Sequence, residues 1–162
     1  MEFVTGQIDD IDVSDKEIFD LLSEVYVQAG YTASDTAKSI FEPAKVRSRG
    51  VVFVAKEVTN NELAGIVIVV PWNSPACVKA KGNECEMHLL GVSPKYRRQG
   101  LGRMLVEIAT KFAKERDLKR MLLWTQKPMT EAQRLYESTG FTRSGEMERN
   151  GIQLMVYERE CI

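Results

Sequence analysis

A strand-like run that leads through a glycine-containing turn into an amphipathic helix is the feature that most constrains the fold of this chain. Residues 84–92 (ECEMHLLGV) have the length and apolar content of a buried strand. From Leu101 to Arg116, apolar side chains recur at helical spacing along one stripe. Residues 119–126 (KRMLLWTQ) then supply a second strand. The segment 84–126 therefore predicts a strand–helix–strand crossover inside a mixed sheet.

The remaining sequence predicts further strands and helices on both sides of this crossover. Ser14 and Glu17 form a capping-box pattern at the start of a helix, and Pro43 must bend or split the next helical stretch. The predicted elements are strand 3–8, the helix from Ser14, the helical stretch 34–49, strands 51–58, 63–72 and 84–92, helix 101–116, strand 119–126, helix 130–139 ended by Gly140, and two strands that flank the hairpin signal Asn150-Gly151. This order predicts an α/β (mixed α+β) fold, with helices on the faces of a mixed sheet.

Length and composition limit the class of protein. The 162 residues and the formal net charge of −1 are typical of one globular domain over residues 1–162, and they argue against bulk attraction to nucleic acid or to an anionic membrane. No apolar run is long enough to cross a membrane, and residues 1–10 lack the pattern of a signal peptide. Three cysteines suit a reduced, cytoplasmic chain, and the single histidine, His88, excludes a His-rich metal site. We therefore expect a cytoplasmic protein without a metal, a nucleic-acid partner or a membrane partner.

The turn between the strand and the helix of the crossover has the composition of an anion site. Gly100 and Gly102 allow a ligand to approach the backbone, and the first amides of a helix have no partner inside it. Arg97, Arg98 and Arg103 add positive charge around these amides. A diphosphate fits such a site. Neither the Walker pattern nor the dinucleotide fingerprint matches the sequence RRQGLG and the residues that follow it.

The pattern Arg-x-x-Gly-x-Gly after VSP resembles the signature of the GNAT superfamily of N-acetyltransferases. The longer block ECEMHLLGVSPKYRRQGLGRMLVEIA resembles that family's central strand, loop and helix, and AQRLYESTGF (132–141) resembles its later helix. The resemblance implies a largely antiparallel seven-stranded sheet with about four helices on both faces. It also implies direct transfer of an acetyl group from acetyl-CoA to a primary amine of a small-molecule or peptide acceptor, and it makes a homodimer plausible.

The resemblance also implies which residues hold the coenzyme. The signature binds the pyrophosphate, and the backbone before it binds the pantetheine arm like an added strand, with a bulge that Gly91 permits. Many family members have an asparagine where this chain has Met129, so Thr125 or Thr130 is expected to replace it. The expected coenzyme-binding residues are Leu90, Gly91, Val92, Arg97, Arg98, Gln99, Gly100, Leu101, Gly102, Arg103, Thr125 and Ala132.

Two residues are the candidates for catalysis. Glu84, Glu86 and His88 share one face of their strand, which we expect to line a wet cleft. By resemblance Glu86 is the general base, directly or through water, with His88 as a rival base and a structural ion pair as the alternative role for Glu86. Tyr136 matches a tyrosine that serves as general acid near the sulfur, the alternative being a core tyrosine. Cys85 lies on the opposite face and is expected to be structural.

Three function classes remain open on the sequence. The first is the N-acetyltransferase, the second is a non-catalytic acyl-CoA-binding or sensing module of the same fold, and the third is an acyltransferase with another acyl group or acceptor. Aminoglycosides, polyamines, amino acids and protein N-termini all remain open as acceptors. The residues Tyr26, Tyr31, Phe41, Trp72 and Asn73 either border the acceptor site or belong to the core.

Overall fold

The structure, a computed structural model, describes residues 1–162 and contains five α-helices. The helices are α1 (Asp15–Leu22), α2 (Ser34–Ile40), α3 (Pro43–Ser48), α4 (Leu101–Glu115) and α5 (Thr130–Ser138). A π-helical turn, Ser23–Val27, continues α1. The resemblance implied about four helices. The fifth arises because Pro43 occupies the first turn of α3 and separates it from α2.

Seven strands form one sheet in the order β1-β2-β3-β4-β5-β7-β6. The strands are β1 (Phe3–Gln7), β2 (Val51–Glu57), β3 (Glu62–Pro71), β4 (Glu84–Val92), β5 (Arg120–Gln126), β6 (Thr142–Arg149) and β7 (Ile152–Glu160). All neighbouring strands pair antiparallel except β4 and β5, which pair parallel and are joined through α4. The seven-stranded, largely antiparallel sheet is therefore confirmed.

Local sequence signals decide where several elements begin and end. The Ser14 hydroxyl accepts a hydrogen bond from the amide of Glu17, whose side chain accepts one from the Ser14 amide, so the predicted capping box is present. Asn150 and Gly151 both have positive φ, 53° and 78°, as a two-residue hairpin turn between β6 and β7 requires. These signals act within a few residues and were readable from the sequence.

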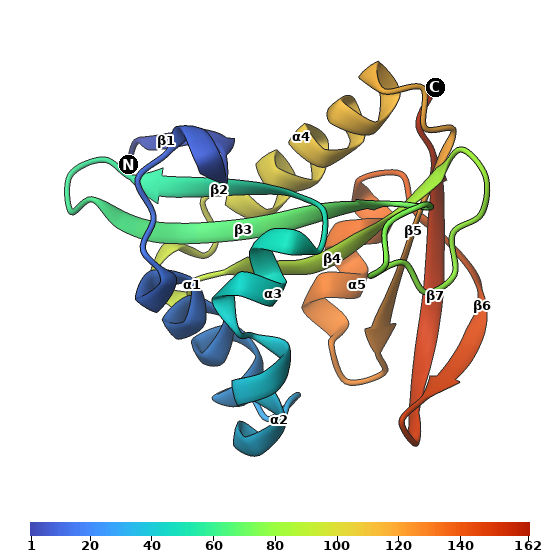
Figure 1. The fold of residues 1–162 in the computed structure, drawn as a ribbon, viewed down its shortest axis with the longest axis horizontal. Helices are drawn as coiled ribbons and strands as arrows, with labels where there is room; N and C mark the ends of the chain where they lie inside the picture. Colours follow the sequence, from blue (N-terminus) through green and yellow to red (C-terminus); the bar gives the residue numbers. More distant parts are fainter.

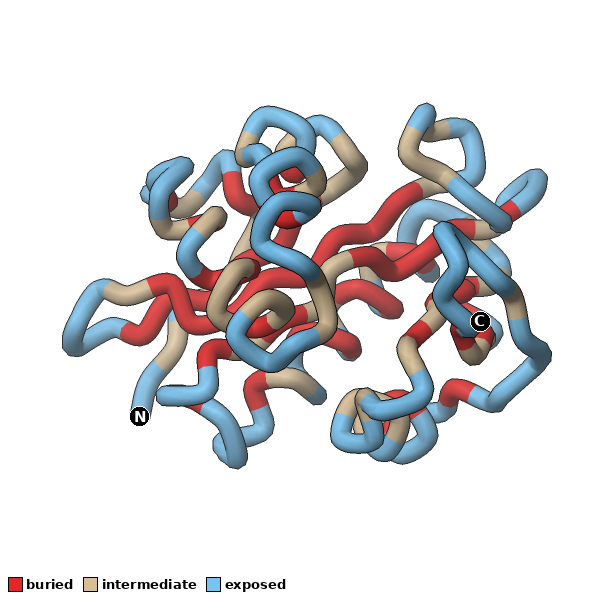
Figure 2. The backbone as a smooth tube through the Cα atoms, turned by 90° about the horizontal axis from the view of Figure 1, so that it is seen from below, coloured by how far each residue is buried: buried red, intermediate tan, exposed pale blue.

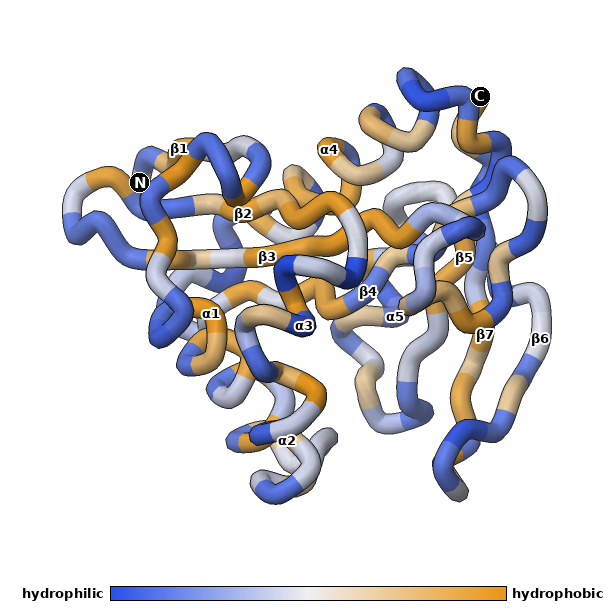
Figure 3. The backbone as a smooth tube through the Cα atoms, viewed as in Figure 1, coloured by the Kyte–Doolittle hydropathy of each residue, from blue (hydrophilic) through white to orange (hydrophobic).

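Two apolar clusters cover opposite faces of the sheet. One contains side chains of β2–β5 together with α4 and α5, and the other contains side chains of β2 and β3 together with α1–α3. Figure 1 shows α1, α2 and α3 on one side of β3 and α4 on the other. Burial is concentrated along the central strands (Figure 2), which coincide with the most hydrophobic stretches of the chain (Figure 3). β4 therefore lies in a sheet that has one apolar cluster, with its covering helices, on each face.

Candidate functional site

β4 and β5 pair over only three residues and then part. Glu84, Cys85 and Glu86 pair with Arg120, Met121 and Leu122. Beyond this short ladder β4 continues towards α1 while β5 turns in another direction (Figure 1). Residues 87–92 consequently have a paired strand, β3, on one side only.

A β-bulge occurs in β4 at the same place. Gly91 pairs with Ile66 and His88 with Ile68, so two residues of β4, Leu89 and Leu90, oppose one residue of β3. Leu89 has a left-handed backbone, with φ 51°. The bulge expected next to Gly91 is therefore present, one to two residues earlier.

The bulge is contacted by the π-helical turn. The Tyr26 hydroxyl donates a hydrogen bond of 2.7 Å to the carbonyl oxygen of Leu90. A Cβ at Gly91 would lie 3.3 Å from Val25, so glycine lets this turn approach β4 closely. The backbone of residues 90–92, expected to hold a pantetheine arm, is thus positioned from one side by β3 and from the other by the turn.

The turn before α4 presents a run of unpaired backbone amides. The amides of residues 98–103 donate to no acceptor in the chain, and the first paired amide is that of Met104, which bonds the Gly100 carbonyl at 3.0 Å. No side chain caps α4. Arg98 and Gly100 have positive φ, 62° and 77°, which turns successive amides towards one side. Six adjacent donors beside the positive end of a helix dipole form an anion site.

The three arginines of this turn are all exposed, but they differ in their partners. Arg97 donates from Nε to the Val92 carbonyl at 3.2 Å, and Arg103 donates to the hydroxyl and carbonyl of Ser138 in α5. Arg98 has no hydrogen-bonding or ion-pair partner in the chain. The charge of Arg98 is therefore available to an incoming anion, whereas the hydrogen bonds of Arg103 also connect α4 to α5.

The remaining expected coenzyme residues lie around the end of β5. Thr125 is buried in β5, and Ala132 packs against the apolar cluster under α4. Gln133 donates from Nε2 to the carbonyls of Gln126 and Lys127 at 3.0 Å. This side chain, which the sequence analysis did not single out, links the end of β5 to α5 where Met129 offers no polar group.

Glu86 is wholly buried, so the expectation of a wet face at this position is wrong. Its carboxylate accepts hydrogen bonds from the amides of Val78, Lys79 and Ala80, with the Ala80 contact at 2.7 Å. Oε1 also lies 2.7 Å from Nε2 of His88. Burial raises the pKa of Glu86, but these hydrogen bonds outweigh it and lower the pKa to about 2. A carboxylate with such a low pKa and fully used oxygens is unsuited to accept a proton directly.

His88 connects Glu86 to the region where the strands part. Because Nε2 faces Glu86, Nδ1 is the ring nitrogen on the other side, and it lies 3.4 Å from Nη1 of Arg49. The ring packs edge-on against Trp124 of β5, with centroids 5.3 Å apart. Burial lowers the pKa of His88, the Glu86 carboxylate opposes this, and the positive charges of Arg49 and Arg149 lower it further. The pKa of His88 ends below its usual range, which keeps the ring neutral at pH 7.

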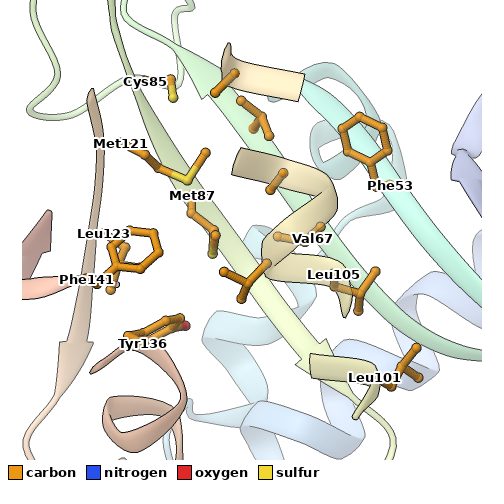
Figure 4. Close-up of a cluster of buried hydrophobic side chains, with 14 of the residues drawn as sticks. Phe53, Val67, Cys85, Met87, Leu101, Leu105, Met121, Leu123, Tyr136 and Phe141 are labelled. Carbon is orange, nitrogen blue, oxygen red and sulfur yellow. The ribbon is translucent and has the colours of Figure 1, made fainter. Parts of the chain in front are cut away.

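Tyr136 extends from α5 into the cluster beneath α4. Its ring packs against Phe141 and Tyr157, at centroid distances of 5.8 and 6.2 Å, and Figure 4 shows its hydroxyl directed away from α5. The hydroxyl has no hydrogen-bond partner in the chain. Burial raises its pKa, and the nearby Tyr26 raises it further, so the group stays protonated at neutral pH. Ser23 Oγ is the one buried side-chain oxygen or nitrogen without a partner, so the Tyr136 hydroxyl keeps some access to solvent and is free to donate a hydrogen bond to a ligand.

The other candidates fall into two groups. Tyr26 and Phe41 pack together at 5.6 Å on the α1–α3 side, and the Tyr31 carbonyl accepts a hydrogen bond from Gln126. Trp72 and Asn73 are exposed in the loop after β3. Cys85 lies in the opposite cluster from Glu86, as expected, and Cys85 and Cys161 are close enough for their thiols to interact there.

The most important residue that the sequence analysis missed is Arg49. It is the residue after α3, and it reaches His88 from 39 positions earlier in the chain. No local pattern marks such a residue, because its role depends on how α3 packs against α1 and β2. The aromatic partner Trp124 was missed for the same reason.

Other features of the surface do not point to a site. A polar hollow of about 420 Å³ around Arg120, Glu158 and Arg159 lies at the other end of β4 from the bulge, and no hydrophobic residue lines it. No group of three or more His, Cys, Asp or Glu side chains is placed to hold a metal ion. None of the helices has both the length and the apolar character that crossing a membrane requires.

Comparison with known proteins agrees with this geometry. Residues 16–141 match the family model described as Acetyltransferase (GNAT) family. An uncharacterized N-acetyltransferase of Archaeoglobus fulgidus is 30% identical over 137 residues, which cover 80% of this chain and 90% of that protein. N-acetyltransferase family 8 member 3 of Rattus norvegicus is 31% identical over 88 residues, 54% of this chain but only 37% of that longer protein.

A solved structure shows the same fold. The PaiA N-acetyltransferase of Thermoplasma acidophilum, solved in complex with coenzyme A, superposes with a TM-score of 0.75 at 17% identity, covering 99% of each chain. The chain belongs to the Acetyltransferase (GNAT) family.

Proposed function

We propose that this protein is an N-acetyltransferase that moves an acetyl group from acetyl-CoA directly to a primary amine. The observation that carries the proposal is the run of unpaired amides over residues 98–103, placed beside the point where β4 and β5 part. Structural neighbours include a family member in complex with coenzyme A, which supports the choice of ligand. Acetyl-CoA supplies an acetyl group already activated as a thioester.

The coenzyme would be held by backbone groups more than by side chains. The amides of residues 98–103 bind the two linked phosphates, Arg98 and Arg97 add counter-charge, and the open space around Gly100 leaves room for the approach. The side of residues 90–92 that does not pair with β3 binds the pantetheine arm, through backbone groups other than the Leu90 and Val92 carbonyls, which already accept hydrogen bonds from Tyr26 and Arg97. Thr125 and Ala132 border the arm from β5 and α5. This arrangement directs the reactive end of the coenzyme to the bulge.

His88 replaces Glu86 as the proposed proton acceptor. Glu86 holds the Nε2 proton of His88 and thereby leaves Nδ1 with the lone pair, so Glu86 is a positioning residue. A neutral His88 takes the proton that the amine loses as its nitrogen attacks the acetyl carbon. The C–S bond breaks, and Tyr136 donates its proton to the departing sulfur. Afterwards His88 releases its proton to water and Tyr136 takes one back from water, which restores both groups with no net change in protons.

The two other classes predict different behaviour. A sensing module binds acetyl-CoA without turnover, whereas an acyltransferase of different specificity releases thiol with another acyl group. The hydrogen-bonded pair of His88 and Glu86, together with the unpaired hydroxyl of Tyr136, favours catalysis over sensing.

The test is release of the CoA thiol from acetyl-CoA, measured over a panel of primary amines with mass detection of the acetylated product. We expect amine-dependent thiol release together with an N-acetyl product. Tight binding of acetyl-CoA with no turnover on any amine would instead indicate the sensing module.

A further inference from the structure

Arg49 brings a positive charge to the acceptor side of the site without a carboxylate to balance it. The residue lies between α3 and β2 and is partly buried. Its guanidinium makes two long contacts, from Nη1 to His88 at 3.4 Å and from Nη2 to the Ile40 carbonyl at 3.5 Å. It forms no ion pair, although the chain contains 23 acidic side chains. Most of its five N–H donors are therefore free.

Glu86, which is linked to Arg49 through His88, cannot serve as the counter-ion of Arg49. Glu86 lies behind the ring of His88, and its oxygens already accept hydrogen bonds from His88, from Cys77 and from three backbone amides. A partly buried guanidinium without a direct counter-ion is costly, so this position favours an anion supplied from outside the chain.

A second cation acts electrostatically on both Arg49 and His88. Arg149, at the end of β6, forms no ion pair. Burial is the main cause that lowers the pKa of Arg49; the charge of Arg149 lowers this pKa further, and Tyr26 raises it. Arg149 also lowers the pKa of His88. Arg49 thus contacts the proposed proton acceptor, and Arg149, 100 positions later in the chain, adds a second positive charge that acts on it from a longer range.

We propose that Arg49, assisted by Arg149, binds an anionic substituent of the amine acceptor, a carboxylate or a phosphate. This inference rests on the proposed function. The planar guanidinium suits two parallel hydrogen bonds to such a group, which would place the amine of the same molecule beside Nδ1 of His88. The same positive charge repels polycationic acceptors, so polyamines and aminoglycosides are disfavoured and amino acids are favoured.

The experiment compares amines that differ only in the anionic group. Each common L-amino acid is paired with its α-amide, and O-phosphoethanolamine is paired with ethanolamine; spermidine and kanamycin represent polycationic acceptors. The readout is kcat/KM for thiol release with acetyl-CoA. We expect at least one anionic member to exceed its neutral partner by about tenfold or more. The two sets of pairs distinguish carboxylate from phosphate recognition.

Variants test whether Arg49 is the cause. Arg49→Gln is expected to reduce the preference for the anionic member to about onefold, and Arg49→Lys to retain part of it. Arg47→Gln is the matched control, because Arg47 lies two residues earlier, in the last turn of α3, but pairs with Asp15, and it is expected to leave the preference unchanged. Calorimetric binding of N-acetyl amino acids and of their amides, with CoA present, gives a second readout that does not depend on turnover.

The possible failures are distinguishable. If neutral or polycationic amines are acetylated as well as the anionic ones, the inference about Arg49 is wrong while the proposed function stands. If acetyl-CoA binds but no amine is acetylated, the proposed function fails, and the inference fails with it. A preference that survives unchanged in both Arg49→Gln and Arg149→Gln would also overturn the assignment.

Discussion

Hydrogen-bond partners decide what the carboxylate of Glu86 can do. Residue type and strand position suggested a general base, but the amides of residues 78–80 and the ring of His88 use its oxygens. The side chain anchors the loop after β3 and orients His88. Its contribution to stability is therefore large, and its contribution to catalysis acts through the neighbouring imidazole.

Replacing Glu86 by glutamine is expected to destabilise the fold. The pKa of Glu86 is about 2 in the folded chain against 4.5 ordinarily, so ionisation stabilises the fold by about 3 kcal/mol at pH 7. This stabilisation is present above pH 4.5 and is lost as the pH falls towards 2, so the difference between Glu86→Gln and the unaltered protein should shrink over that range. Urea unfolding at several pH values measures it.

Glu84→Gln is the control for this experiment. Glu84 lies on the same face of β4 but is only partly buried and pairs with Arg120 at 3.3 Å. Its replacement should cost about 1 kcal/mol or less. Equal stability of Glu86→Gln and the unaltered protein at pH 7 would contradict the anchoring role.

Tyr136→Phe is expected to lower kcat by about 100-fold while leaving the affinity for acetyl-CoA nearly unchanged. The change removes only the hydroxyl, and the ring contacts with Phe141 and Tyr157 remain. Tyr157→Phe is the matched control from the same aromatic group. Steady-state kinetics and calorimetry separate the two effects, and a parallel loss of turnover and affinity would indicate a packing role.

At the scale of elements, the site depends on where β4 stops pairing and where α4 begins. The short ladder between β4 and β5, the bulge at residues 89–90 and the uncapped start of α4 lie along one continuous segment. Backbone groups of that segment provide most of the proposed coenzyme contacts. Substitutions that fill the space over those groups should therefore be more damaging than loss of a single side chain.

Gly102→Trp tests this dependence on the backbone. A Cβ at Gly102 would lie 3.0 Å from Leu135 of α5, so the indole must displace α5 or the start of α4 that carries the amides, and we expect acetyl-CoA affinity to fall at least about 100-fold, equivalent to about 2.7 kcal/mol. Gly82→Trp is the control, since Gly82 has open space around it in a distant loop. Circular dichroism verifies that both variants fold, and unchanged affinity in Gly102→Trp would refute the placement of the coenzyme.

At the scale of the whole molecule, the sequence predicted what depends on nearby residues. The capping box at Ser14, the break at Pro43 and the hairpin at residues 150–151 all follow from local chemistry. The exposed, glycine-containing turn before α4 also follows from local chemistry. These signals sufficed for the order of the elements, whereas the seven-stranded, largely antiparallel sheet was implied by the family resemblance.

Features that arise from packing between distant segments were not predictable. Polar residues at alternate positions in β4 indicated a wet face, but the loop of residues 76–81 folds over Glu86 and buries it. The π-helical turn at 23–27 continues the helical periodicity of α1, so no pattern distinguished it. Arg49 contacts His88 only because α3 packs against α1 and β2 on that face of the sheet.

The central claim is that the backbone amides of residues 98–103 bind the two linked phosphates of acetyl-CoA. Titration of the ¹⁵N-labelled protein with CoA, followed by amide resonances, tests it most directly. We predict large, saturable shifts at residues 98–103 that pantetheine, which lacks the diphosphate, does not reproduce. Shifts confined to other parts of the chain, with these six amides unmoved at saturation, would contradict the account.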